Sequence, residues 1–219
     1  MKKVFIFLVC ICVTSSFMAL NAQSVASKKD IADNYKKRHA IYDYSEANLN
    51  NTDTIPGFGT ISDKLKISGT IYKSDGVTPA SGVILYICQS DDYGNYHSKK
   101  VNGKRVLKHK GWIKTDADGK YTFYTFVPGT YWPTKALMEI HGVIKEPNTS
   151  EEYAIEHFIF DNDPHLRDSC RKKIEKKGLN NILKLEEKDG MLIGKRDIVL
   201  SQNPKKYIRL LDSLVFSCY

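Results

Sequence analysis

The chain has 219 residues, of which 42% are hydrophobic and 26% charged, and its formal net charge is +8 at pH 7. This balance excludes a highly charged, disordered chain and is sufficient for one globular core. The basic residues are dispersed except for one cluster over residues 171–177, which lacks the interleaved aromatic residues that stack on bases. We therefore predict no nucleic-acid partner and interpret the cluster as the solvated face of a helix.

Residues 1–22 have the order of a secretory signal peptide. Two lysines precede an apolar run over residues 4–13, and small and polar residues follow as far as Ala22, where we expect cleavage. The apolar run is shorter than the ~20 residues that span a bilayer, and no later stretch approaches that length. We expect an exported protein, periplasmic or extracellular, without a stable membrane span. A lipid anchor at Cys10 or Cys12 is disfavoured because neither follows the usual small-residue pair.

The next segment, residues 23–60, is a polar N-terminal leader. We expect a short helix over residues 28–42 and loose packing until Pro56 and Gly57 begin the main domain. That domain spans residues 61–205, and residues 206–219 form a C-terminal tail.

Within residues 61–205 the pattern is one of short strands separated by turns. Alternation predicts a strand over 64–72, and an apolar run over 82–89 predicts a buried one. Asp118 and Gly119 supply a tight turn between two further strands. The remaining predicted elements are strands over 112–115, 120–126, 137–144 and 153–160, a helix over 163–178, and a hairpin over 182–200 that turns at Asp189 and Gly190. The fold class is therefore all-β, a β-sandwich with short peripheral helices.

Three cysteines follow the signal peptide, Cys88, Cys170 and Cys218, without a Cys-x-x-Cys pair. One disulfide, such as Cys170 to Cys218, suits an oxidising compartment, but the pairing stays open.

Glu139 and His141 lie two positions apart in the strand predicted over residues 137–144. Side chains alternate along a strand, so both point to one face with Cβ atoms about 6 to 7 Å apart. A carboxylate and an imidazole at that spacing can hold one metal ion, although an ordinary solvent-facing pair has the same spacing. Tyr96 and Tyr131, each two residues after a glycine at a turn or strand end, add two phenol side chains.

Taken in order, these stretches resemble the intradiol ring-cleavage dioxygenases, non-haem ferric enzymes on a prealbumin-like β-sandwich. The resemblance covers about residues 60–205. The stretch "ISGTIYKSDGVTPASGVILYICQSDDYGNY" is similar to the family's Pro-x-x-Gly segment followed by a core strand and Gly-x-Tyr, and it ends at Tyr96. "KGWIKTDADGKYTFYTFVPGTYW" resembles the family's T-D-x-x-G-x-Y-x-F-x-T-x-x-P-x-x-Y stretch, which ends at Tyr131. "EIHGVIKEP" stands where the family has His-x-His, and "FIFDNDPHL" resembles its F-x-x-D-P segment.

This resemblance implies a ferric ion, Fe(3+), bound by two tyrosinates and two histidines. The implied substrates are a catechol-type diphenol and O2, which opens the ring between the two hydroxyl-bearing carbons. By motif position Tyr96 and Tyr131 are the tyrosinates and His141 is the second histidine. Tyr131 is also the catalytic residue, because the family's tyrosinate at this position leaves the iron when substrate binds. Glu139 occupies the first histidine position, and a carboxylate there keeps a hard ligand but adds one negative charge.

Three further histidines have less definite roles. His157, in the strand predicted over residues 153–160, lies near a family pocket position, and a hydrogen-bonded, partly buried histidine fits it equally well. His97 and His109 are interpreted as surface loop histidines. The predicted function is thus that of an exported iron(III) intradiol dioxygenase. The alternative is an inactive secreted β-sandwich that binds carbohydrate or protein, in which Tyr96, Tyr131 and His141 would lie more than ~8 Å from a common centre. The sequence leaves the oligomeric state open.

Overall fold

The computed structural model describes residues 34–202. The predicted signal peptide and the whole of the predicted C-terminal tail, residues 206–219 with Cys218, lie outside the described residues. The chain divides into a unit over residues 1–37 and a second unit over residues 38–219, and every element below belongs to the second unit.

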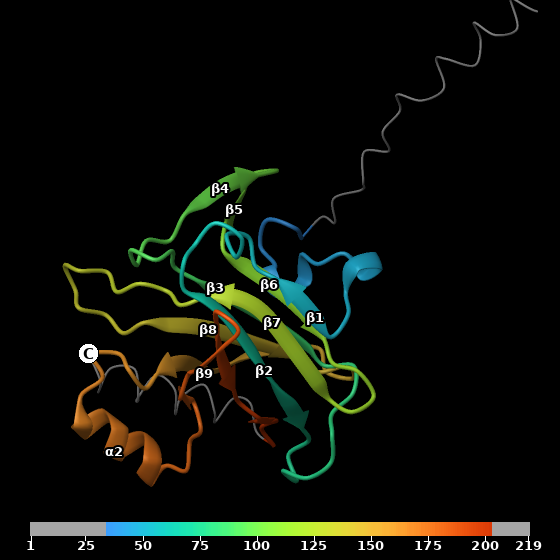
Figure 1. Cartoon of the computed structure of the whole chain (residues 1–219). Coiled ribbons are helices and arrows are strands. Elements are labelled where there is room, and N and C mark those ends of the chain that lie inside the picture. The colour runs from blue at the N-terminus through green and yellow to red at the C-terminus, as the bar shows by residue number, and fades with distance from the viewer. Residues whose placement is uncertain (1–33, 203–219) are drawn as a thin grey trace, which may run out of the picture. The chain divides into compact units, whose positions relative to one another are not determined.

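Two β-sheets make up the second unit (Figure 1). The six-stranded sheet has the order β1-β7-β2-β12-β11, with β13 also paired to β2, and the five-stranded sheet has the order β10-β9-β8-β3-β6. A separate hairpin consists of β4 and β5. The strands are β1 Thr52–Thr54, β2 Lys64–Tyr72, β3 Ile84–Gln89, β4 Ser98–Val101, β5 Lys104–Leu107, β6 Lys110–Lys114, β7 Lys120–Phe126, β8 Glu139–Lys145, β9 Glu152–Phe160, β10 Ile182–Leu183, β11 Glu186–Lys188, β12 Met191–Lys195 and β13 Ile198–Val199. The helices are the 3-10 turns η1 Ala40–Tyr42 and η2 Glu46–Asn48, and the α-helix α2 Asp168–Lys176.

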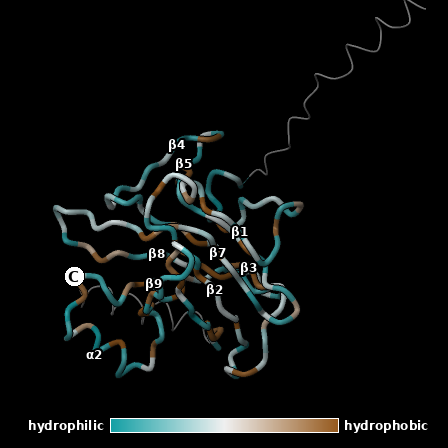
Figure 2. The backbone as a smooth tube through the Cα atoms, in the orientation of Figure 1, coloured by the Kyte–Doolittle hydropathy of each residue, from teal (hydrophilic) through white to brown (hydrophobic). Residues whose placement is uncertain are grey.

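The core lies between the two sheets and follows from the alternation of apolar side chains. Ile67 and Phe123 from the first sheet are buried in one cluster with Leu85 and Ile140 from the second. Figure 2 shows apolar positions along the central strands and polar ones in many of the connecting loops. The all-β sandwich expected from the sequence is confirmed.

The predicted strands and the helix are also found, with shifts of a few residues at their ends. The expected final turn is formed by Asp189 and Gly190, both with positive φ, between β11 and β12. The β4–β5 hairpin was not predicted, although Asn102 and Gly103 at its turn are a standard hairpin signal and both have positive φ.

The expectation of a loosely packed leader is wrong for its described part. Ile41 and Ile55 are buried, and β1 pairs with β7. The chain forms the 3-10 turn η1 where a longer helix was predicted, and the His39 ring accepts a hydrogen bond from the Ile41 amide there. Ile41 packs with Ile84 on the outer face of β3. This cover explains why β3 is buried on both faces instead of alternating.

Among the described cysteines, Cys170 is disulfide-bonded and Cys88 is a free thiol. Cys88 is therefore excluded from the predicted bridge, and Cys218, the proposed partner, lies outside the described residues. Within residues 34–202, no helix has the length and apolar character needed to cross a membrane.

Candidate metal site

The candidate site lies on the outer face of the five-stranded sheet, where β8 and β9 run antiparallel. Ile140 on β8 faces Phe158 on β9, whereas Gly142 faces Ile155, so His141 alone lies opposite two residues of β9. This is a β-bulge, a local irregularity that re-aims side chains and occurs often beside functional sites.

The bulge reverses the faces of β9 along its length. Before it, Tyr153 and Ile155 point into the core between the sheets, while beyond it Phe158 and Phe160 do so. His157 consequently leaves the core and turns to the outer face beside His141. Gly142 makes room for this arrangement, because a Cβ there would lie 2.7 Å from Ile155 Cγ1.

Four predicted residues meet on this face in one continuous set of contacts. The Tyr96 hydroxyl lies 2.7 Å from His141 Nε2. His141 Nδ1 lies 3.1 Å from His157 Nε2, and His157 Nδ1 lies 2.8 Å from Glu139 Oε2. The other carboxylate oxygen, Glu139 Oε1, is 3.5 Å from His141 Nε2. Alternation correctly placed Glu139 and His141 together, whereas the position of His157 required the bulge.

The donor atoms fit a single metal ion. His141 Nε2 lies 2.7 Å from Tyr96 Oη and 3.5 Å from Glu139 Oε1. Adjacent ligands at about 2.1 Å from one ion are separated by about 3 Å, which is close to both of these distances. Two oxygens and one imidazole nitrogen also suit a hard, high-valent cation. Glu139, His141 and His157 together form a group of potential metal ligands whose donor atoms lie within 4.8 Å of one another.

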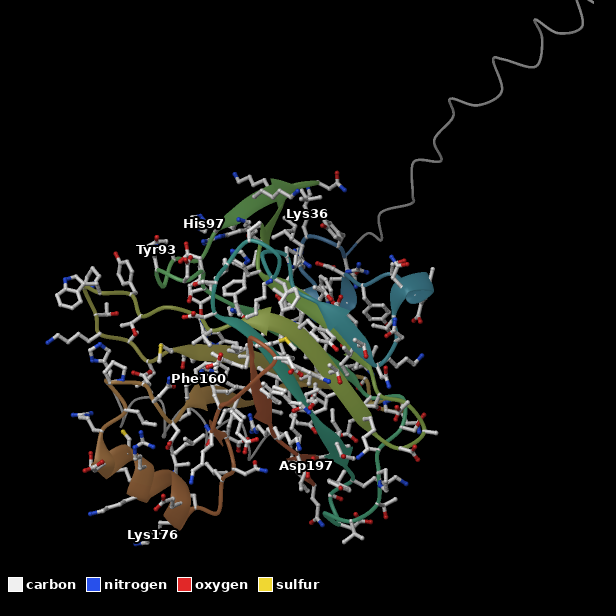
Figure 3. The ribbon with its side chains drawn as sticks, in the orientation of Figure 1. Lys36, Tyr93, His97, Phe160, Lys176 and Asp197 are labelled. Atoms are coloured by element: carbon white, nitrogen blue, oxygen red, sulfur yellow. The ribbon has the colours of Figure 1, made fainter. Side chains whose placement is uncertain are left out.

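The Tyr96 side chain is presented by a tightly turned loop between β3 and β4. The Asp91 carboxylate accepts hydrogen bonds from the backbone amides of Tyr93 at 2.9 Å and Asn95 at 2.7 Å. It also contacts the ring of His97 at 2.7 Å. Tyr93 and His97 lie on this loop in Figure 3. His97 is thus a loop histidine that supports the turn preceding the site.

The backbone of Tyr131 packs against the loop that carries Tyr96. A Cβ at Gly94 would lie 2.2 Å from the Tyr131 amide nitrogen, and Gly129 donates a hydrogen bond to the Asp91 carbonyl at 2.8 Å. The Tyr131 side chain is 46% exposed, and no hydrogen bond from a described residue reaches its hydroxyl. The structure therefore joins Tyr96, Glu139, His141 and His157 by direct side-chain contacts, and Tyr131 approaches Gly94 through its backbone.

The environment of the cluster sets its protonation without a cation. Burial lowers the pKa of His141 to about 4; His157 acts in the same direction and Glu139 opposes it. Burial raises the pKa of the Tyr96 hydroxyl, with smaller contributions from Glu139 and Cys88. At pH 7 the imidazole of His141 is neutral and the phenol of Tyr96 is protonated. A bound cation would reverse the preference of the phenol because it stabilises the tyrosinate.

His109 differs from the sequence interpretation. It is 2% exposed rather than a surface residue, and its Nδ1–H donates to the Pro56 carbonyl at 2.6 Å. Its ring packs edge-on against Phe126, with 5.0 Å between the ring centroids. His109 is therefore a core histidine that joins residues 56–57 to the sandwich.

Comparison with known proteins identifies the fold and its family. A family model described as dioxygenase matches residues 34–192. The dioxygenase domain of a dioxygenase carbohydrate-binding protein fusion from Streptomyces sp. SirexAA-E is 21% identical, with a TM-score of 0.51, over 70% of this chain and 88% of that one. Catechol 1,2-dioxygenase from Pseudomonas arvilla C-1 is 15% identical, with a TM-score of 0.52, over 73% and 59% of the two chains. An intradiol ring-cleavage dioxygenase from Tetranychus urticae is 18% identical, with a TM-score of 0.50, over 71% and 89%. A search of curated proteins found no significant match.

Proposed function

Because the chain belongs to the dioxygenase family that matches residues 34–192, we propose that it is an exported, iron(III)-dependent intradiol dioxygenase acting on a catechol-type diphenol and O2. The observation that carries this proposal is the meeting of the Tyr96 hydroxyl and His141 Nε2 at 2.7 Å, with a Glu139 oxygen 3.5 Å from the same nitrogen. The alternative of a non-catalytic module predicted that Tyr96, Tyr131 and His141 lie more than ~8 Å from a common centre. The contact between Tyr96 and His141 favours the metal site over that alternative. Export is supported by the charged and apolar pattern of residues 1–22.

Tyr96, His141 and Glu139 would hold the ion, with Tyr131 as a fourth donor. A bound ferric ion would supply the positive charge that favours deprotonated phenols and the Lewis acidity that activates a diphenol toward O2. Tyr131 suits an exchangeable role, because it is exposed and its hydroxyl makes no hydrogen bond to any residue within 34–202. Glu139 brings one more negative charge than a histidine would, so the ion here should be a weaker Lewis acid than one with two imidazoles.

The test uses the full purified protein, reconstituted with ferric iron. We expect about one iron per chain, a visible tyrosinate-to-iron absorption band that changes when catechol is added, and oxygen uptake with formation of a ring-opened diacid. Tyr96→Phe should weaken and shift the band, because Tyr131 is then the one remaining tyrosinate, whereas Tyr93→Phe, on the same loop but 73% exposed, should leave it unchanged. Protein that remains colourless and free of iron after reconstitution would refute the proposal.

The position of Glu139 can be tested separately. Glu139→His restores the family's His-x-His pattern, and we expect it to increase iron affinity or ring-cleavage rate because the added negative charge is removed. Unchanged iron content in both Glu139→His and His141→Ala would show that the cluster does not hold the metal.

A specific feature favours a second function if iron is absent. Tyr93, Tyr131 and Trp132 are exposed by 73%, 46% and 78%, and exposed aromatic side chains of this kind are used for binding carbohydrate or protein. A colourless protein that binds a polysaccharide, with binding lost in Trp132→Ala, would support the binding module instead.

A further inference from the structure

We propose that His157 is a positioning residue of the metal site, which joins His141 to Glu139 so that His141 Nε2 and Glu139 Oε1 face one cation. The inference rests on the metal-binding part of the proposed function. Neither the family's His-x-His motif nor the alternation of side chains along β9 predicts this role for His157.

The hydrogen-bond directions follow from the chemistry of the groups. The Glu139 carboxylate can only accept, so the contact of 2.8 Å requires a proton on His157 Nδ1. With a neutral ring, His157 Nε2 then carries a lone pair and accepts from His141 Nδ1–H at 3.1 Å. His141 Nε2 is consequently the acceptor nitrogen of its ring, and the Tyr96 hydroxyl donates to it at 2.7 Å. With a neutral His157 ring, every contact in the set is satisfied by this one order of donors and acceptors.

This order selects the tautomer of His141 that a metal requires. A ligating imidazole must present an unprotonated nitrogen, and its other nitrogen usually donates to a nearby acceptor that fixes the ring. Here His157 Nε2 is that acceptor. The cation would take the place of the Tyr96 proton at His141 Nε2, while the remaining two hydrogen bonds stay as they are.

Glu139 is held by the same residue. Its Oε2 accepts from His157, which leaves Oε1 on the side of His141 Nε2. The side chains of Glu139, His141 and His157 are only 16%, 31% and 23% exposed, so the hydrogen bonds compete with little water. Carboxylates that bind a metal ion are themselves usually hydrogen-bonded by an outer residue, which orients them, and His157 has that place here.

The rival role for His157 is that of a direct ligand. The donor atoms of Glu139, His141 and His157 lie close enough for this, within 4.8 Å of one another. However, both nitrogens of His157 already have partners, so direct ligation would break one of its two hydrogen bonds. The observed contacts therefore favour a positioning role for His157 over direct ligation. The number of histidine rings coordinated to the metal ion distinguishes the two roles, one for positioning and two for direct ligation.

The first measurement uses metal-free, 15N-labelled protein at pH 8. We expect the 15N shifts to show His141 protonated on Nδ1 in the wild type and in His157→Gln, because a glutamine amide can both accept from His141 and donate to Glu139. His157→Leu should lose this fixed tautomer. His165→Leu, a histidine outside the cluster, should leave it unchanged. A wild-type His141 protonated on Nε2 would overturn the inference.

The second measurement counts coordinated imidazoles by pulsed EPR with bound Cu(II). We expect one imidazole in the wild type and in His157→Gln, and an affinity about 10- to 100-fold lower in His157→Leu than in the wild type. Two coordinated imidazoles in the wild type, falling to one in His157→Gln, would overturn the positioning role. A wild type that has the expected tautomer but binds neither ferric iron nor Cu(II) would instead refute the proposed function.

Discussion

Arg196 and Glu156 form a buried ion pair directly behind the bulge that positions His157. Arg196 donates to the Glu156 carboxylate at 3.0 Å and to the Glu156 backbone carbonyl at 2.7 Å. The two side chains are 2% and 7% exposed, and the guanidinium stacks over Phe158 at 4.6 Å from the ring centroid. These contacts hold Glu156, one of the two β9 residues opposite His141, toward the core. Its neighbour His157 therefore points outward.

Replacing Arg196 with methionine keeps an apolar stem against Phe158 but removes the charge and both hydrogen bonds to Glu156. Breaking one side of a buried pair costs about 3 to 5 kcal/mol, because the remaining carboxylate is buried without its charged partner. This is a large share of the ~5 to 15 kcal/mol by which proteins of this kind are stable. Arg196→Met combined with Glu156→Gln should cost less than the sum of the two single variants, by about 2 kcal/mol, because the double variant removes both charges of the pair together.

The assay is urea unfolding at pH 7, followed by tryptophan fluorescence, for the wild type, both single variants and the double variant. Glu146→Gln serves as a control, because its carboxylate lies at a more exposed position and bonds the Tyr153 hydroxyl. Strict additivity of the two single costs, or a cost for Arg196→Met no greater than that of Glu146→Gln, would show that the pair does not stabilise the bulge.

Two further predictions concern the residues around the site. Gly94→Ala should destabilise the protein by at least ~2 kcal/mol more than Gly76→Ala in the same urea assay. Both glycines have positive φ, so the backbone strain of alanine is common to both variants. A Cβ at Gly94 would lie 2.2 Å from the Tyr131 nitrogen, whereas nothing lies within 4 Å of a Cβ at Gly76. Equal effects would mean that the close approach of the two loops is not rigid. The pKa of His141 is lowered from 6.5 to about 4, so the folded state binds this proton more weakly than the unfolded state does. The contribution of His141 to the free energy of unfolding therefore falls as the pH decreases from about 6.5 to 4. His141→Gln should therefore flatten the loss of stability over this pH range, measured by urea midpoints, relative to the wild type and to His165→Gln; an unchanged slope would contradict the assigned shift.

The local pattern of the chain was sufficient for most of the fold. Alternation in residues 64–72 and 120–126 predicted β2 and β7, since side chains that alternate in polarity can bury one face of a strand. The same rule placed Glu139 and His141 on one face, because their spacing is a property of the strand itself. The loose packing predicted for the leader was wrong because the burial of Ile41 and Ile55 is not a local property. Both lie in a polar segment, and they are buried by sheets formed from residues much later in the chain.

The site was only partly determined by sequence. Strict alternation places His157 on the same face as Tyr153 and Ile155, which is the core. The bulge opposite His141 reverses that assignment, and it depends on the missing side chain of Gly142 and on a buried charge pair between residues 40 positions apart. The sequence by itself determined which strands carry the carboxylate and the imidazoles. Only the tertiary structure decided that His157 joins them, because a bulge is set by the pairing of two strands and by what supports them from behind.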